Sequence, residues 1–288
     1  MTTRTVTEII AGFATSDGAG VKLLRSLGQH QHSRLDPFLM LDEFSTDDPN
    51  DYIAGFPSHP HRGFETVTYM LEGHMLHEDH LGNRGHLRSG DVQWMTAARG
   101  IIHSEMPQQQ NGRMHGFQLW INLPAREKMK PASYRDIPAA QIPLLKLANG
   151  TAVKVIAGSF AQDEQHADGP IQGLTTQPRF LDVQLPANVG FKHATPAQHN
   201  AFIYVYQGRI TVGEGASAKQ LGAHTAALLS QGDQVFVTAT QDARFLLLAA
   251  QPLNEPVVQY GPFVMNTRDE IEQAVRDSQL GKLTGASA

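Results

Sequence analysis

Short runs of β-branched, aromatic and aliphatic residues recur along the chain, separated by clusters of glycine, proline, asparagine and aspartate. Eight of these runs predict strands, at residues 66–71, 92–96, 117–122, 153–157, 180–185, 202–206, 234–238 and 245–249. Many short strands with few helical periods between them favour sandwiches or barrels over a sheet with crossover helices. We therefore expect an all-β fold.

One segment near the C-terminus has the pattern of a helix. Thr267 and Glu270 have the spacing of a capping box, in which the hydroxyl and the carboxylate each accept a hydrogen bond from the other residue's backbone N–H. Ile271 and Ala274 then begin an apolar stripe, and Gly281 is a suitable stop. The pattern predicts a short C-terminal helix that packs on the body of the protein.

Two stretches of the chain resemble two later stretches in the same order. Tyr69–Met75 resembles Tyr204–Ile210 at an offset of 135 residues, and Ser89–Ala97 resembles Gln231–Ala239 at an offset of 142. Each half then has a strand, a glycine turn, a strand, and a Gly-Asp turn before a further strand. An internal repeat of this kind predicts two similar β-barrels in one chain.

The length also favours two domains, because 288 residues exceed the usual size of a single hydrophobic core. The boundary between the two domains is expected where three prolines interrupt regular structure, at Pro131, Pro138 and Pro143. We expect one barrel over residues 1–135, and a second barrel with the terminal helix over residues 136–288.

Composition and charge narrow the classes of function. Hydrophobic residues make up 41% and charged residues 18%, which is ordinary for a chain that buries a core. The formal net charge of −5 gives no basic footprint for nucleic acid, so we expect no direct contact with nucleic acid. No apolar stretch is long enough for a bilayer, and Met1–Ile10 lacks the apolar core of a signal peptide. We expect a cytoplasmic protein without membrane contact.

Cysteine is absent, which limits the chemistry further. The chain can form no disulfide, no thiolate metal site and no cysteine nucleophile. Any metal must be held by carboxylates or by some of the 14 histidines.

Two short motifs have the spacing of metal ligands. Residues i and i+2 of an extended chain point to the same face, so His59 and His61 would lie side by side, as would His103 and Glu105. Pro60 favours an extended conformation at His59. Three imidazoles and a carboxylate suit Fe(II), Mn, Co, Ni, Cu or Zn, and four protein ligands leave two positions of an octahedral ion open. The alternative is four unrelated polar residues, since such short motifs also arise by chance.

The second half does not repeat these ligands. Shifting the four positions by the repeat offsets leads to Ala194, Pro196, Phe245 and Leu247. We therefore expect any metal site to lie in the first barrel alone.

The residues around the four candidates resemble the pirin family, bicupins of the cupin superfamily. The resemblance extends over nearly the whole chain and is carried by His59–Val67, Gly90–Thr96, Gly100–Glu105, Asp36–Phe44, Gly116–Pro124 and Gly261–Thr267. It implies a first cupin barrel that holds one iron through His59, His61, His103 and Glu105, and a second barrel without metal. The sequence departs from the family at Ala98, where glycine is usual.

The resemblance also implies an activity, because members of the pirin family act as quercetin 2,3-dioxygenases. The implied reaction opens a flavonol ring with O2 and releases carbon monoxide. In our hypothesis the flavonol 3-hydroxyl coordinates the metal, with Fe(II) expected first and Mn, Co, Ni, Cu or Zn as alternatives, and Glu105 takes its proton as general base. A small aromatic substrate suits an apolar barrel mouth, which Phe56, Trp94, Phe117 and Trp120 could line, although core packing explains these four equally well.

Two other functions stay open. Pirins can also act as regulatory binding proteins, so the chain could be a redox-responsive metal-binding protein that acts through a protein partner. A third possibility is a cupin specialised for another reaction, such as an isomerase. Oxygen uptake with a flavonol would separate the enzyme from the regulator.

Other titratable residues near the two motifs are weaker candidates for metal ligands. Glu65 has the same parity as His59 and His61, but the carboxylate ligand of pirins matches Glu105, so we interpret Glu65 as an outer-sphere or structural residue. His74, His77 and His80 lie close to glycine turns, and we expect them to be solvent-exposed hairpin residues.

Overall fold

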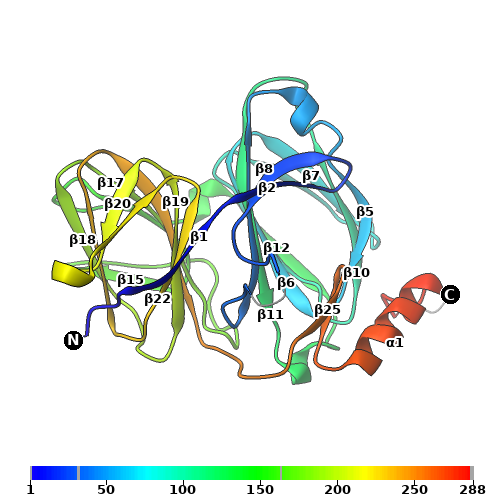
Figure 1. The fold of residues 1–288 in the computed structure, drawn as a ribbon. Coiled ribbons are helices and arrows are strands. Elements are labelled where there is room, and N and C mark those ends of the chain that lie inside the picture. The colour runs from blue at the N-terminus through cyan, green and yellow to red at the C-terminus, as the bar shows by residue number, and fades with distance from the viewer. Residues whose placement is uncertain (1, 31–32, 163, 286–288) are drawn as a thin grey trace. The chain divides into compact units, whose positions relative to one another are not determined.

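The computed structural model describes residues 2–30, 33–162 and 164–285. Within these ranges the chain forms 26 strands, four 3₁₀ helices and one α-helix, α1 (Arg268–Gln279). The all-β fold with a short C-terminal helix is confirmed, and all eight predicted runs lie within strands (Figure 1). None of the helices in the described ranges is long and apolar enough to cross a membrane.

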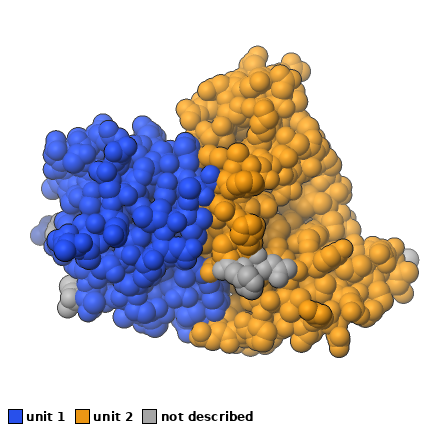
Figure 2. All heavy atoms as spheres, in the orientation of Figure 1, with its two compact units in different colours: residues 1–12, 35–37, 140–252 blue, residues 13–34, 38–139, 253–288 orange. Residues whose placement is uncertain are grey.

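Contacts group the chain into two compact units that are not continuous in sequence. Unit 1 contains Met1–Gly12, Leu35–Pro37 and Ala140–Pro252, and unit 2 contains Phe13–Arg34, Phe38–Ala139 and Leu253–Ala288 (Figure 2). This grouping differs from the linear division at residue 135 in both terminal segments, since β1 (Val6–Ala11) pairs with β22 (Thr225–Leu229) and α1 packs on β26 (Phe263–Met265).

Unit 2 contains two antiparallel sheets. The larger has the order β12-β9-β6-β11-β4-β3-β2, and the smaller has the order β5-β10-β7-β8. Their bounds are β2 (Phe13–Asp17), β3 (Val21–Arg25), β4 (Phe38–Thr46), β5 (Phe56–His61), β6 (Phe64–Glu72), β7 (His74–Asp79), β8 (Arg84–Arg88), β9 (Val92–Thr96), β10 (Ile101–Pro107), β11 (Met114–Asn122) and β12 (Ser133–Ile137). The pair β25 (Val258–Tyr260) and β26 (Phe263–Met265) precedes α1, and η1 (Pro49–Asp51) and η2 (Ala125–Glu127) lie in loops.

Unit 1 has the same plan. Its larger sheet has the order β1-β22-β19-β24-β17-β14-β13, its smaller sheet the order β18-β23-β20-β21, and β15 pairs with β16. The bounds are β1 (Val6–Ala11), β13 (Leu144–Lys146), β14 (Ala152–Ala157), β15 (Ser159–Gln162), β16 (Gln165–Asp168), β17 (Arg179–Leu185), β18 (Val189–Ala194), β19 (Asn200–Gln207), β20 (Arg209–Val212), β21 (Lys219–Gly222), β22 (Thr225–Leu229), β23 (Gln234–Ala239) and β24 (Ala243–Ala250). Two 3₁₀ helices complete the elements, η3 (Ala139–Gln141) and η4 (Gly215–Ser217).

The internal repeat is present, but one of its two sequence matches was out of register. In chain order and sheet position, β5 to β11 correspond to β18 to β24. The match of Tyr69–Met75 with Tyr204–Ile210 spans corresponding strands. The match of Ser89–Ala97 with Gln231–Ala239 was wrong by one strand, because it aligns β9 with β23, the counterpart of β10. A Gly-Asp turn precedes both segments, and this local similarity misled the alignment.

The corrected correspondence changes which residues of unit 1 replace the candidate ligands. The counterparts of the ligand strands β5 and β10 are β18 and β23, not the segment around Phe245. The buried positions on these two strands are Phe191 and His193 on β18, and Val235, Val237 and Ala239 on β23. They are apolar except for His193, so the interior of unit 1 is filled by packed side chains.

His193 is itself part of that packing. Its ring stacks on Phe160, with centroids 5.1 Å apart and an interplanar angle of 10°. Neither ring nitrogen has a hydrogen-bond partner in the described part of the chain. Burial, with a smaller contribution from Arg179, lowers the pKa of His193 to about 3, so this imidazole stays neutral in the folded protein.

The helix α1 packs against unit 2 as its sequence pattern suggests. The Thr267 hydroxyl accepts a hydrogen bond from the backbone N–H of Glu270, and the Glu270 carboxylate accepts one from the backbone N–H of Thr267, at 2.8 Å, which confirms the capping box. Ile271 and Ala274 are buried against Phe263. The described C-terminal segment, residues 253–285, therefore forms part of the same unit as β5 and β10.

His193→Phe should reduce the acid sensitivity of unit 1. An exposed histidine has a pKa of about 6.5, so between that value and about 3 the unfolded chain binds a proton that the folded chain does not. Stability therefore falls as the pH is lowered through 6.5. We expect the loss of unfolding free energy between pH 7 and pH 5 to shrink by about 2 kcal/mol in the variant, measured by denaturant unfolding.

His166→Gln is the matched control, because the His166 side chain in the same unit is 59% exposed. It should leave the pH dependence unchanged. The same acid dependence in His193→Phe as in the unmodified protein would contradict the interpretation.

Candidate metal centre

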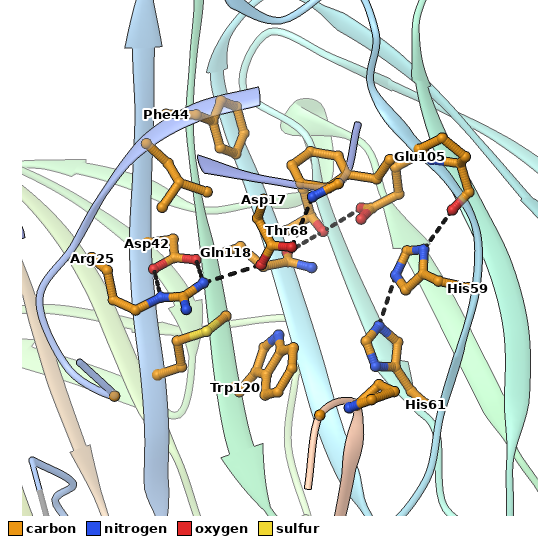
Figure 3. A pocket seen from close by; sticks show the side chains of 18 of the residues that line it. Asp17, Arg25, Asp42, Phe44, His59, His61, Thr68, Glu105, Gln118 and Trp120 are labelled. Atoms are coloured by element: carbon orange, nitrogen blue, oxygen red, sulfur yellow. Dashed lines mark hydrogen bonds and ion pairs between the residues drawn. The ribbon is translucent and has the colours of Figure 1, made fainter. Parts of the chain in front are cut away.

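A cavity of about 680 Å³ lies within unit 2 (Figure 3). Residues from β2, β3, β4, β5, β6, β7, β10 and β11 line it, together with Gln259, Gly261 and Pro262 from the C-terminal segment. His59, His61 and Glu105 are among the lining residues. Three of the four predicted ligands thus face one space, and His103 packs against the rings of His59 and His61 beside it.

The pairing of β5 with β10 brings the three histidines together. The two strands are antiparallel, and His59 lies directly opposite His103 in their register. One ring nitrogen of each of His59, His61 and His103 lies within 4.8 Å of the other two, and the Nε2 atoms of His59 and His61 are 3.0 Å apart. We call these three residues the histidine cluster.

Contacts behind the rings set their orientation. Nδ1 of His59 lies 2.8 Å from the carbonyl oxygen of Pro57, and Nδ1 of His103 lies 2.8 Å from Nε2 of His77. An imidazole whose Nδ1–H donates in this way has an unprotonated Nε2 with a free lone pair. In that tautomer His59 and His103 each present an unprotonated Nε2, and Nε2 of His61 lies beside that of His59.

The chemistry of the cluster fits a metal ion. Nε2 of His103 is buried and has no hydrogen-bond partner in the described ranges, and an unpaired buried polar atom is costly. Burial, and then the neighbouring imidazoles of the cluster, hold the pKa values of His61 and His103 well below the usual range. Neutral imidazole is the form that binds metal ions.

Glu105 lines the same cavity but is held in a different way. Its side chain is on β10 and 5% exposed, and one oxygen, Oε1, accepts a hydrogen bond of 2.9 Å from Thr68 Oγ1. Thr68 Oγ1 also lies 2.6 Å from Gln118 Oε1, although its single proton can serve only one acceptor at a time. The Glu105 carboxylate is not among the atoms of the 4.8 Å group.

His77 was overlooked in the sequence. We expected it to be exposed on a hairpin together with His74 and His80, and this was wrong for His77, which is 1% exposed. It lies on β7 opposite Glu105 of β10, and its ring touches that of His103. The spacing of histidines in one strand gives no information about which strand pairs with it, so no sequence signal identified this contact.

Glu65 and the four aromatic residues named in the sequence analysis differ in whether they line the cavity. Glu65 is buried, accepts a 2.7 Å hydrogen bond from Thr96 and does not line the cavity; burial raises its pKa. This agrees with a structural role. Phe56 and Trp120 line the cavity, whereas Trp94 and Phe117 are buried elsewhere in the core.

The C-terminal segment is bonded to the backbone next to the cluster. Arg62, which follows His61, donates to the Asp277 carboxylate and to the Leu283 carbonyl oxygen, each at 2.8 Å, and also to the carbonyl oxygen of Arg99. The buried Lys128 ammonium donates to the carbonyl oxygens of Gly63 and Val264, and to the side chain of Asn122, at 2.6 to 2.9 Å. These bonds connect the loops that flank β5 and β10.

Ala98, the departure from the family pattern, takes up the conformation that glycine would favour. Its φ is 43°, in the left-handed region, and its carbonyl oxygen accepts a hydrogen bond from Gly63 N. The loop before His103 is thus formed with alanine in this position.

Comparisons with known proteins agree with the fold and the motifs. The chain is 54% identical to a Pseudomonas aeruginosa protein named "Putative quercetin 2,3-dioxygenase", over 97% of this chain and 98% of that protein. It is 40% identical to human Pirin, over 96% and 93% of the two chains. A crystal structure of quercetin 2,3-dioxygenase from Acinetobacter baumannii superposes with a TM-score of 0.88 at 33% identity, covering 98% of each chain.

The family comparison covers both halves. Residues 20–121 match the family described as Pirin, and residues 180–284 match the Pirin C-terminal cupin domain. Together with the relatives and the histidine cluster, these matches show that the chain belongs to the pirin family of bicupins.

Proposed function

We propose that this protein is a metal-dependent quercetin 2,3-dioxygenase, which cleaves a flavonol with O2 at His59, His61, His103 and Glu105. The observation that carries the proposal is the histidine cluster, with its unpaired buried Nε2 atom, beside a carboxylate in a cavity of about 680 Å³. The names of the Pseudomonas and Acinetobacter relatives support the same reaction.

The donor set fits a divalent transition metal. Three neutral imidazoles with one carboxylate suit Fe(II), which we propose first, and also Mn, Co, Ni, Cu or Zn. Such an ion, when bound, supplies Lewis acidity towards the substrate oxygen and, if it is redox-active, a route for electrons between substrate and O2.

Glu105 is the residue that we propose as general base. Thr68 holds Oε1, which leaves Oε2 to take the proton of the flavonol 3-hydroxyl. The anion that forms is electron-rich and reacts with O2. Two carbon–carbon bonds of the central ring break, the carbon between them leaves as carbon monoxide, and both oxygen atoms of O2 are retained in the ester product.

The walls of the cavity suit a flat aromatic molecule. Phe44, Phe56 and Trp120 line it together with aliphatic and methionine side chains. Such a surface binds ring systems by burial of apolar area and excludes water from the reacting atoms.

Replacing His59, His61, His103 and Glu105 together with alanine should abolish metal binding, because no other donor set of this kind is present in the described residues. We expect elemental analysis of purified protein to give one transition-metal ion per chain before the replacement and none after it. His80→Ala, which removes an exposed histidine of the same unit, is the control. Metal retained by the fourfold variant would refute the proposed site.

Glu105→Gln should preserve the fold and lower turnover by about 10²- to 10⁴-fold, the usual contribution of a general base. Oxygen uptake and carbon monoxide release with quercetin, measured on metal-loaded protein, test this. A variant with near-normal activity would remove Glu105 from the role of base. If the unmodified protein consumes no flavonol, the redox-responsive binding protein becomes the better hypothesis.

Thr68→Val should destabilise the protein by about 1–3 kcal/mol, because the buried Glu105 carboxylate loses the hydroxyl that donates to Oε1. It should also lower turnover, since the carboxylate is then free to rotate. Denaturant unfolding and oxygen uptake measure the two effects. Thr66→Val is the control, because it makes the same chemical change on the same strand at a residue that does not line the cavity. Equal effects of the two substitutions would contradict a role for Thr68 in holding Glu105.

A further inference from the structure

The cavity contains a second polar group, separate from the histidine cluster. Arg25 donates to both carboxylate oxygens of Asp42, from Nε at 2.8 Å and from Nη2 at 2.7 Å. The same Nη2 donates to Asp17 Oδ2 at 3.1 Å. All three residues line the cavity, and Figure 3 shows Arg25 and Asp42 well apart from His59 and His61, with Trp120 between the two groups.

The strands of the larger sheet fix this group in place. Arg25 ends β3 and lies opposite Asp42 of β4 in the strand register. Because the Asp42 side chain is only 3% exposed and both its oxygens accept from Arg25, this ion pair holds the guanidinium plane. Asp42 is therefore a positioning residue for Arg25.

Asp17 differs from Asp42 in being accessible. Its side chain is 52% exposed, and it accepts one hydrogen bond from Arg25 and one from the backbone N–H of Gly18, at 2.7 Å. A carboxylate has about four acceptor sites, so Asp17 has acceptor capacity left. Nη1 of Arg25 has no partner in the described ranges, and this nitrogen supplies free donors.

The charges of the group decide what it would bind. Two carboxylates and one guanidinium leave one surplus negative charge, and Arg25 is the one lysine or arginine among the described lining residues. An anionic substituent would be repelled there. A hydroxyl group, by contrast, can donate to Asp17 and accept from Arg25.

We propose that Asp17 and Arg25 form a hydroxyl-recognising subsite that selects flavonols bearing adjacent hydroxyls on the pendant phenyl ring. This inference rests on the proposed function, because the 3-hydroxyl end of the substrate must lie at Glu105. One hydroxyl donates to the Asp17 carboxylate, and the neighbouring oxygen accepts from Nη1 of Arg25. The subsite thus determines specificity at the end of the substrate that takes no part in bond cleavage.

A pair of ligands tests the subsite without turnover. We would measure the binding of quercetin and of 3,5,7-trihydroxyflavone, which lacks both hydroxyls on the pendant phenyl ring, to metal-loaded protein by calorimetry without oxygen. We expect quercetin to bind about tenfold or more tightly, the typical effect of a hydrogen bond to a charged group. Asp17→Asn should remove most of this preference and leave the affinity for 3,5,7-trihydroxyflavone unchanged.

Asp47→Asn is the matched control, because Asp47 is exposed and does not line the cavity; it should keep the full preference. If both flavonols bind equally to the unmodified protein, or if Asp17→Asn keeps the preference, the subsite is wrong while the proposed function stands. If neither flavonol binds, the subsite and the proposed function both fail.

Discussion

The antiparallel pairing of β5 with β10 is the constraint on which the rest of the site depends. It puts His59 opposite His103, and it brings His59 and His61 of one strand and Glu105 of the other to the same cavity. A slip of one residue would turn these side chains to the other face of the sheet. A register shift in this pairing lies between His103 and Glu105, yet both residues stay on the buried face of β10; the Glu105 carboxylate accepts a hydrogen bond from Thr68 and lies outside the histidine cluster. The strand β10 thus supplies a carboxylate to the cavity and an imidazole to the histidine cluster beside it.

This register is supported by residues that never face the cavity. Arg62 and Lys128 bond the loops next to the ligand strands to the C-terminal segment. Gly63 is required there, because a Cβ atom in its place would lie 1.9 Å from the carbonyl oxygen of Val264. A segment more than 190 residues away in sequence therefore lies against the loop that follows His61. Buried cations bonded to backbone oxygens hold such loops in one arrangement, since every alternative leaves polar atoms unpaired.

Periodicity and spacing predicted much of this structure, and they failed where the answer depended on pairing between distant strands. The eight strand runs, the capping box of α1 and the placement of His59 beside His61 on one face of a strand follow from patterns within a few residues. The proximity of His103 to these two depends on the pairing of β5 with β10, and only the resemblance to pirins indicated it. The burial of His77 and the correct counterpart of β10 do not follow from such patterns either, because each is set by which strand lies alongside. The sequence also did not predict that β1 belongs to unit 1 and α1 to unit 2. Each of these segments packs on strands from the other side of the division at residue 135.

The two units show what separates a site from a core when the topology is the same. Each has a buried histidine on the corresponding strand, β5 or β18, and in each unit a buried imidazole nitrogen lacks a partner. In unit 1 the His193 ring stacks on Phe160, and its burial reduces stability because no hydrogen bond in the described residues replaces the lost hydration. In unit 2 three imidazoles converge, so a single ion could satisfy them together. An unpaired buried imidazole nitrogen therefore only lowers stability in unit 1. In unit 2 one metal ion could offset the same cost, because several imidazole nitrogens surround one point.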